Sequence, residues 1–81
     1  MIRIRTVRPL SDHTLELGLS NGTTRVIDVA PLLRGPVLEA VRSDPALFRA
    51  VRVDEVLGTI VWPNGGDLDP DVLVLGLEPA P

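Results

Sequence analysis

The sequence lacks several residue types on which common catalytic and metal sites depend. Among its 81 residues there is no cysteine and a single histidine, His13. A disulfide scaffold, a thiolate zinc site and a cysteine nucleophile are therefore excluded, and one histidine is too few to favour any other zinc site. A chain without cysteine suits a reducing compartment, so we expect a cytoplasmic protein.

Lysine and long apolar runs are missing too. All eight basic residues are arginine, and 11 acidic residues give a net charge of −3. A net-acidic chain lacks the electrostatic footprint of a general nucleic-acid binder. The longest apolar run, residues 72–77, is far too short to span a bilayer, and residues 1–5 alternate in polarity where a signal peptide would be apolar. No membrane partner is expected.

Aromatic residues are limited to Phe48 and Trp62, so aliphatic side chains must build the core. A chain of this size forms one domain and buries only about 60–65% of its unfolded surface, which leaves little room for a catalytic cavity. We predict a single domain over residues 1–81, with residues 76–81 as a loose C-terminal tail.

Alternating apolar and polar residues, together with β-branched content, predict five strands. They cover residues 2–8, 14–20, 23–29, 51–54 and 59–62. Ser20-Asn21-Gly22 predicts a tight hairpin between the second and third strands. Within the third strand, either Val26 lies outside or Arg25 lies near the core, so an exposed edge or a bulge is expected there.

Helices are predicted where a capping residue or glycine precedes proline. Gly35-Pro36 and Asp44-Pro45 begin two short helices between the third and fourth strands, after a helical turn at 30–33. Asp69-Pro70 begins another, and 72–77 fits either helix or strand, with a helical turn favoured. The predicted fold class is α+β: an antiparallel sheet of about five strands in the order β-β-β-α-β-β, with short helices on one face.

One segment, Gly58-Thr-Ile-Val-Trp-Pro-Asn-Gly-Gly-Asp67, is distinctive. Before it, in order, come the hairpin turn at 20–22, Asp28-Val-Ala-Pro-Leu-Leu-Arg-Gly-Pro-Val37, Phe48 and Val51-Arg-Val-Asp54. Over about residues 2–75 these features resemble the small bacterial DUF2442 family. The resemblance implies a compact α+β fold and no established activity. Some relatives carry a helix-turn-helix domain, and others look like partners of neighbouring small proteins, as in toxin–antitoxin pairs.

The acids Asp67, Asp69 and Asp71 stand at every second position, as at the start of a calcium-binding loop. However, Val72 stands where such a loop requires glycine. We therefore favour Asp69 as a helix cap, with Asp71 beside the positive end of the helix dipole. The preceding Asn64-Gly65-Gly66 is similarly favoured as a structural turn over an anion-binding nest. No metal or cofactor is expected.

No catalytic constellation is evident. A general base needs an orienting acid and a nucleophile within reach. His13 has Asp12 beside it in the sequence, but its spacing to the serines and threonines matches no recognised catalytic triad. A solvated turn histidine is the favoured interpretation, and no catalysis is expected.

Two features suggest a contact surface. Trp62 is either a core residue or an exposed anchor of the kind enriched in interface hot spots, and the sequence leaves this open. Arginines on neighbouring strands form either a basic stripe or a solvated face paired with Glu16 and Asp28. The candidate interaction surface comprises Trp62, Pro63, Asn64, Asp67, Asp69, Arg3, Arg5 and Arg25. The predicted function is an interaction module that binds a protein partner or itself as a homo-oligomer; the alternative is a nucleic-acid-associated regulator of antitoxin type.

Overall fold

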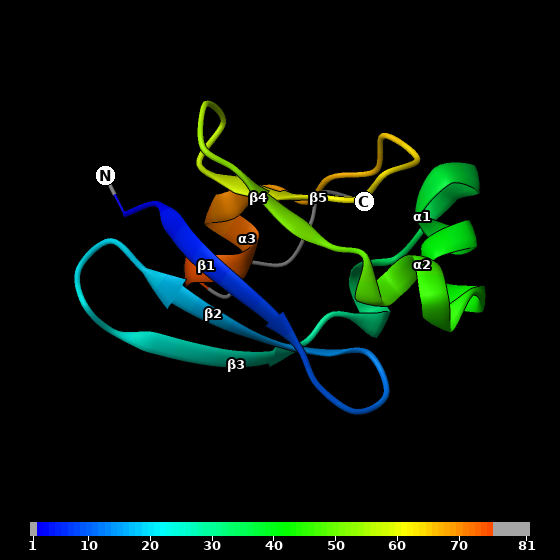
Figure 1. Cartoon of the computed structure of the whole chain (residues 1–81), viewed down its shortest axis with the longest axis horizontal. Coiled ribbons are helices and arrows are strands. Elements are labelled where there is room, and N and C mark those ends of the chain that lie inside the picture. The colour runs from blue at the N-terminus through cyan, green and yellow to red at the C-terminus, as the bar shows by residue number, and fades with distance from the viewer. Residues whose placement is uncertain (1, 76–81) are drawn as a thin grey trace.

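A computed structural model describes residues 2–75 of the chain (Figure 1). The predicted α+β class is confirmed, and all five predicted strands form. In chain order the elements are β1 (Ile4–Pro9), β2 (Thr14–Leu19), β3 (Thr24–Asp28), the short 3-10 helix η1 (Ala30–Leu32), α1 (Gly35–Ser43), α2 (Pro45–Arg49), β4 (Arg52–Asp54), β5 (Thr59–Val61) and α3 (Pro70–Leu75). The predicted tail at 76–81 lies outside the described residues.

The strands divide into two antiparallel groups rather than one continuous ladder. β1, β2 and β3 form a three-stranded sheet in that order, and β4 pairs with β5 in a separate hairpin. The hairpin lies beside β1 (Figure 1), where the Ile4 N–H donates to the Gly58 carbonyl at 3.1 Å. A bulge between Ile4 and Thr6 interrupts the β1–β2 register at this end. Bulges bend a strand, which fits the break between the two groups.

Alternation along β2 creates the core. Leu15, Leu17 and Leu19 are buried on one face of the sheet, while the intervening Glu16 lies on the other. Phe48 from α2 and Leu73 from α3 join this cluster. The period of two in the sequence thus determines which face of the sheet the helices cover.

The ambiguity in the third strand has a clear outcome. β3 is an edge strand, and Val26 on its outer face is 59% exposed. Arg25 pairs with Leu17 and therefore lies on the inner face, where it is half-buried. Of the two outcomes expected for this strand, an exposed edge or a bulge, the exposed edge is confirmed. The bulge in this sheet lies in β1 instead.

The predicted caps start two of the helices. The Asp44 carboxylate accepts from the Ala46 and Leu47 amides at the start of α2. The Asp69 carboxylate accepts from the Asp71 amide at 2.8 Å at the start of α3, which confirms the capping interpretation. Residues 72–75 are helical, and the remainder of the 72–77 run lies outside the described residues. Within residues 2–75, no helix is long and apolar enough to cross a membrane.

Candidate interaction surface

Trp62 belongs to the core. Its side chain is 1% exposed, and its ring lies 6.3 Å from that of Phe48. The indole Nε1–H donates to the Phe48 carbonyl at 3.0 Å, so its only polar group is satisfied. Of the two interpretations of Trp62, the structure supports the core residue, and the indole itself offers no surface for a partner.

The turn that follows Trp62 is a structural corner. The Trp62 amide donates to the Gly66 carbonyl at 2.8 Å, closing the turn. The Asn64 side chain accepts from the Gly66 amide at 3.1 Å and donates to the Val37 carbonyl at 2.9 Å. A Cβ on the buried Gly66 would lie 2.9 Å from Leu38 Cδ2. This corner ties the end of β5 to α1, and the Gly66 amide that an anion nest would need is already bonded.

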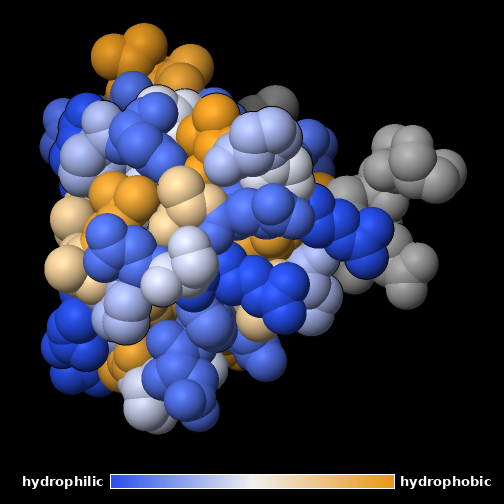
Figure 2. Space-filling model, turned by 90° about the vertical axis from the view of Figure 1, so that its right-hand side faces the viewer, coloured by the Kyte–Doolittle hydropathy of each residue, from blue (hydrophilic) through white to orange (hydrophobic). Residues whose placement is uncertain are grey.

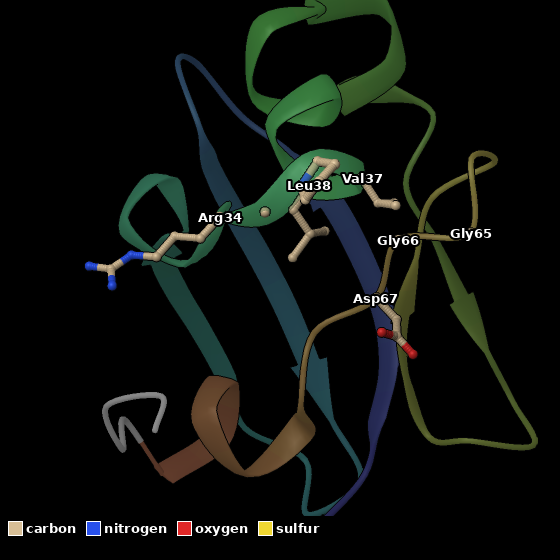
Figure 3. Close-up of a pocket in the computed structure, with 8 residues that line it drawn as sticks. Arg34, Val37, Leu38, Gly65, Gly66 and Asp67 are labelled. Atoms are coloured by element: carbon tan, nitrogen blue, oxygen red, sulfur yellow. The ribbon is translucent and has the colours of Figure 1, made fainter. Parts of the chain in front are cut away.

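A shallow hollow of about 340 Å³ lies between this corner and α1 (Figure 3). Val37 and Leu38 line it on one side, and Gly65 and Gly66 on the other. Its two charged side chains, Arg34 and Asp67, point to opposite sides (Figure 3). Small-molecule sites combine an enclosed apolar pocket with converging polar groups, and this hollow has neither.

The arginines of the predicted surface do not form one stripe. Arg3 donates to the Glu55 and Val56 carbonyls at 2.8 and 2.9 Å. Arg25 is half-buried on the inner face of the sheet, while Arg5 lies exposed at the bulge in β1. Elsewhere, Glu16 is engaged by Arg8 at 2.8 Å and Asp28 accepts from the Ala30 amide at 2.9 Å. Three different environments thus hold the three candidate arginines.

The sequence predicts a turn at residues 55–58 between β4 and β5, but the predicted interaction surface did not include it. Val56 is 87% exposed and Leu57 57% exposed at its tip. The Asp54 carboxylate accepts from both of their amides, at 2.9 and 3.0 Å, and Gly58 closes the turn through the Asp54 carbonyl at 2.8 Å. Arg3, which directly precedes β1, donates to the same turn. Val56 and Leu57 are therefore displayed on a turn whose backbone is bonded both from within and by the Arg3 side chain.

A second shallow hollow, of about 380 Å³, adjoins this tip. Its lining residues are Leu57, Thr59, Asp67, Leu68, Asp69 and Pro70. The buried Thr59 hydroxyl donates to the Leu68 carbonyl at 2.6 Å and fixes the base of the hollow. Asp67 and Asp69 are exposed, and within residues 2–75 neither forms an ion pair. We call Val56, Leu57, Asp67 and Asp69 the tip surface.

The tip surface differs from the end of the molecule formed by α1 and α2. That end is mostly hydrophilic, with apolar residues in separate small groups (Figure 2). The tip surface, by contrast, places Leu57 in the same hollow as two carboxylates, with the exposed Val56 next to Leu57 in the chain. A signal for it was present in the sequence: Val56-Leu57 stands in a predicted turn, where polar residues are the usual choice.

His13 has a structural role. It is half-buried rather than solvated, and its ring meets the edge of Phe48 at a centroid distance of 5.4 Å. Its Nε2 lies 2.8 Å from the Arg42 carbonyl. Because a carbonyl can only accept, Nε2 carries the proton in this contact. His13 thus joins the β1–β2 turn to the helices.

Comparison with known proteins agrees with the fold. The family model described as a protein of unknown function, DUF2442, matches residues 4–79. No curated protein and no solved structure matches the chain significantly. The matched range contains the sheet, the corner at 62–66 and the tip surface. Since the match covers nearly all of its residues, the chain belongs to the DUF2442 family of proteins of unknown function.

Proposed function

We propose that this chain is a non-catalytic, cytoplasmic interaction module that binds a protein partner through the tip surface. The observation that carries the proposal is the display of Val56 and Leu57, 87% and 57% exposed, on a turn fixed by Asp54 and Arg3. An apolar contact on an already ordered backbone loses little conformational entropy on binding. Exposed apolar residues on a rigid loop are typical of contact sites.

The chemistry of the tip surface indicates the kind of partner. Asp67 and Asp69 line the hollow next to Leu57 and form no ion pair within the described residues. A lysine or arginine of a partner can lay its methylene stem along Leu57 and bring its charge to these carboxylates. The net charge of −3 also favours approach of a basic partner. The proposed partner therefore presents a basic side chain next to an apolar one.

A displayed-peptide selection tests this proposal. Peptides selected on the wild-type protein are expected to combine lysine or arginine with apolar residues and to lose binding to the Val56→Ser/Leu57→Ser variant. Val37→Ser is the matched control, because Val37 is also exposed but lies on α1, across the corner from the tip. Selected peptides that bind both variants as well as the wild type would contradict the proposal.

The alternative, a nucleic-acid-associated regulator, makes a different prediction. It requires Arg3, Arg5 and Arg25 to act together, and binding that weakens steeply with salt. The engagement of Arg3 by the turn and the inner-face position of Arg25 favour the protein partner. A mobility shift of duplex DNA at low salt that Arg5→Ser abolishes would support the alternative instead.

A further inference from the structure

The two edges of the three-stranded sheet differ. On the β1 edge the strand carries a bulge between Ile4 and Thr6, ends at Pro9, and bonds through Ile4 to the β4–β5 hairpin. Bulges, prolines and covering segments are the usual means by which proteins prevent an edge strand from pairing with another chain. β3 is the other edge, and it has no proline, no bulge and, within residues 2–75, extensive contact with β2 alone.

The bonding pattern shows which backbone groups β3 offers. The Leu19 amide donates to the Thr23 carbonyl and the Val29 amide to the His13 carbonyl, both at 2.9 Å. Hydrogen-bonded and non-bonded pairs alternate along an antiparallel ladder, so every second residue of β3 directs its N–H and C=O away from β2. Those residues are Thr24, Val26 and Asp28. Within the described chain their backbone groups bond to no other element.

We propose that two copies of this chain pair through antiparallel β3 strands, with Val26 of one copy opposite Val26 of the other. This register places Thr24 opposite Asp28, where a hydroxyl can donate to a carboxylate, and joins two exposed valines on the outer face. Of the two neighbouring symmetric registers, one would place Arg25 opposite Arg25, and like charges directly opposite destabilise a pair. The other, centred on Ile27, would place Val26 opposite Asp28 and lose both matched pairs. The strand is therefore best matched to itself in the register centred on Val26.

The pairing extends the sheet of one copy into that of the other and is independent of the tip surface. The β4–β5 hairpin lies at the β1 edge, and β3 lies at the opposite edge (Figure 1). Both tip surfaces therefore remain free in the pair, which would hold two partner molecules. Because a five-residue strand buries little area, a weak and concentration-dependent dimer is expected.

Cysteine cross-linking tests the register. The chain has no cysteine, so Val26→Cys introduces its only thiol. Opposite residues of a bonded antiparallel pair have Cα atoms about 5.5 Å apart, within the range that a disulfide spans. Under mild oxidation, Val26→Cys is expected to form a covalent dimer about tenfold faster than Val56→Cys, an exposed control at the tip. Val26→Cys cross-linking no faster than Val56→Cys would overturn the proposed register.

Sedimentation equilibrium tests the dimer itself. The wild type is expected to dimerise with rising concentration, and Val26→Lys, which places two like charges together, to remain monomeric with an unchanged circular dichroism spectrum. Val56→Lys adds the same charge at the tip and should still dimerise. A wild type that stays monomeric up to about 1 mM would overturn the proposal. A failed peptide selection at the tip surface would leave these results unaffected, so the two proposals fail separately.

Discussion

At the scale of single residues, the indole of Trp62 joins two parts of the chain, the end of the β4–β5 hairpin and α2. Trp62 directly follows β5, and its indole packs on Phe48 and donates to the Phe48 carbonyl at 3.0 Å. We predict that Trp62→Phe lowers the free energy of unfolding by about 2–4 kcal/mol, since it removes buried volume and the indole hydrogen bond to that carbonyl. Urea unfolding measures this loss. It is followed by circular dichroism rather than by fluorescence, because the variant has no tryptophan.

The control for this prediction is the neighbouring exposed proline. Pro63→Ala should change the free energy of unfolding by much less than Trp62→Phe, because the Pro63 side chain is exposed. If the two variants lost equal stability, the corner would depend on the turn rather than on the indole. In the wild type, tryptophan emission should be blue-shifted and poorly quenched by iodide, as expected of a buried indole.

Gly58 is the second decisive residue. Its φ of +70° disfavours any side chain, and a Cβ would lie 2.8 Å from Arg3 Nε. Gly22 also has positive φ, +86°, but nothing within 4 Å of its Cβ position. We predict that Gly22→Ala costs about 1 kcal/mol from strain alone, and that Gly58→Ala costs more because Arg3 must also move.

A double-mutant cycle separates the two causes. In an Arg3→Ala background, the cost of Gly58→Ala in the free energy of unfolding should fall to that of Gly22→Ala. An unchanged cost would show that Arg3 does not pack against the turn as described. Chemical denaturation of the four variants is sufficient for this measurement.

At the scale of elements, short helices depend on their caps. The carboxylate of Asp44 accepts from two amides of α2, which has only five residues. We predict that Asp44→Ala lowers the free energy of unfolding by about 1 kcal/mol. Asp44→Asn should lower it by much less, because asparagine caps a helix nearly as well as aspartate. Equal losses in both variants would contradict the capping role. Thermal unfolding by circular dichroism compares them.

The elements also show what the sequence can and cannot predict. Strands and caps were predictable because alternation and the Asp-Pro pairs act over neighbouring residues. The separation of the hairpin from the sheet, and the fixed β4–β5 turn, depend on contacts such as Arg3 with Glu55, which lie 52 positions apart. No local pattern encodes those contacts. For the same reason the sequence could not predict whether Trp62 is buried, since its burial depends on contact with Phe48, 14 positions earlier.

At the scale of the whole molecule, charge should govern partner binding. Asp67 and Asp69 have no ion-pair partner within residues 2–75 and add to a net charge of −3. We predict that affinity for a selected basic peptide falls as salt rises from about 0.05 to 0.5 M, because exposed charges are screened over this range. Fluorescence anisotropy gives the dissociation constants.

The matched variant for this prediction is Asp67→Asn/Asp69→Asn. Asparagine keeps the cap of α3 but removes both charges, so binding should weaken and become nearly independent of salt. If the variant retained the full salt dependence, the carboxylates of the tip surface would not be the groups that contact the peptide.

The proposed partner binding depends on an apolar turn that is ordered before any partner arrives. Backbone ¹⁵N relaxation of the free protein measures this directly at Val56, Leu57 and Gly58. We predict order parameters near 0.85, as in the strands, and a drop at these three residues in Arg3→Ala. Order parameters below about 0.6 in the wild type would show a flexible turn and contradict a preformed contact surface.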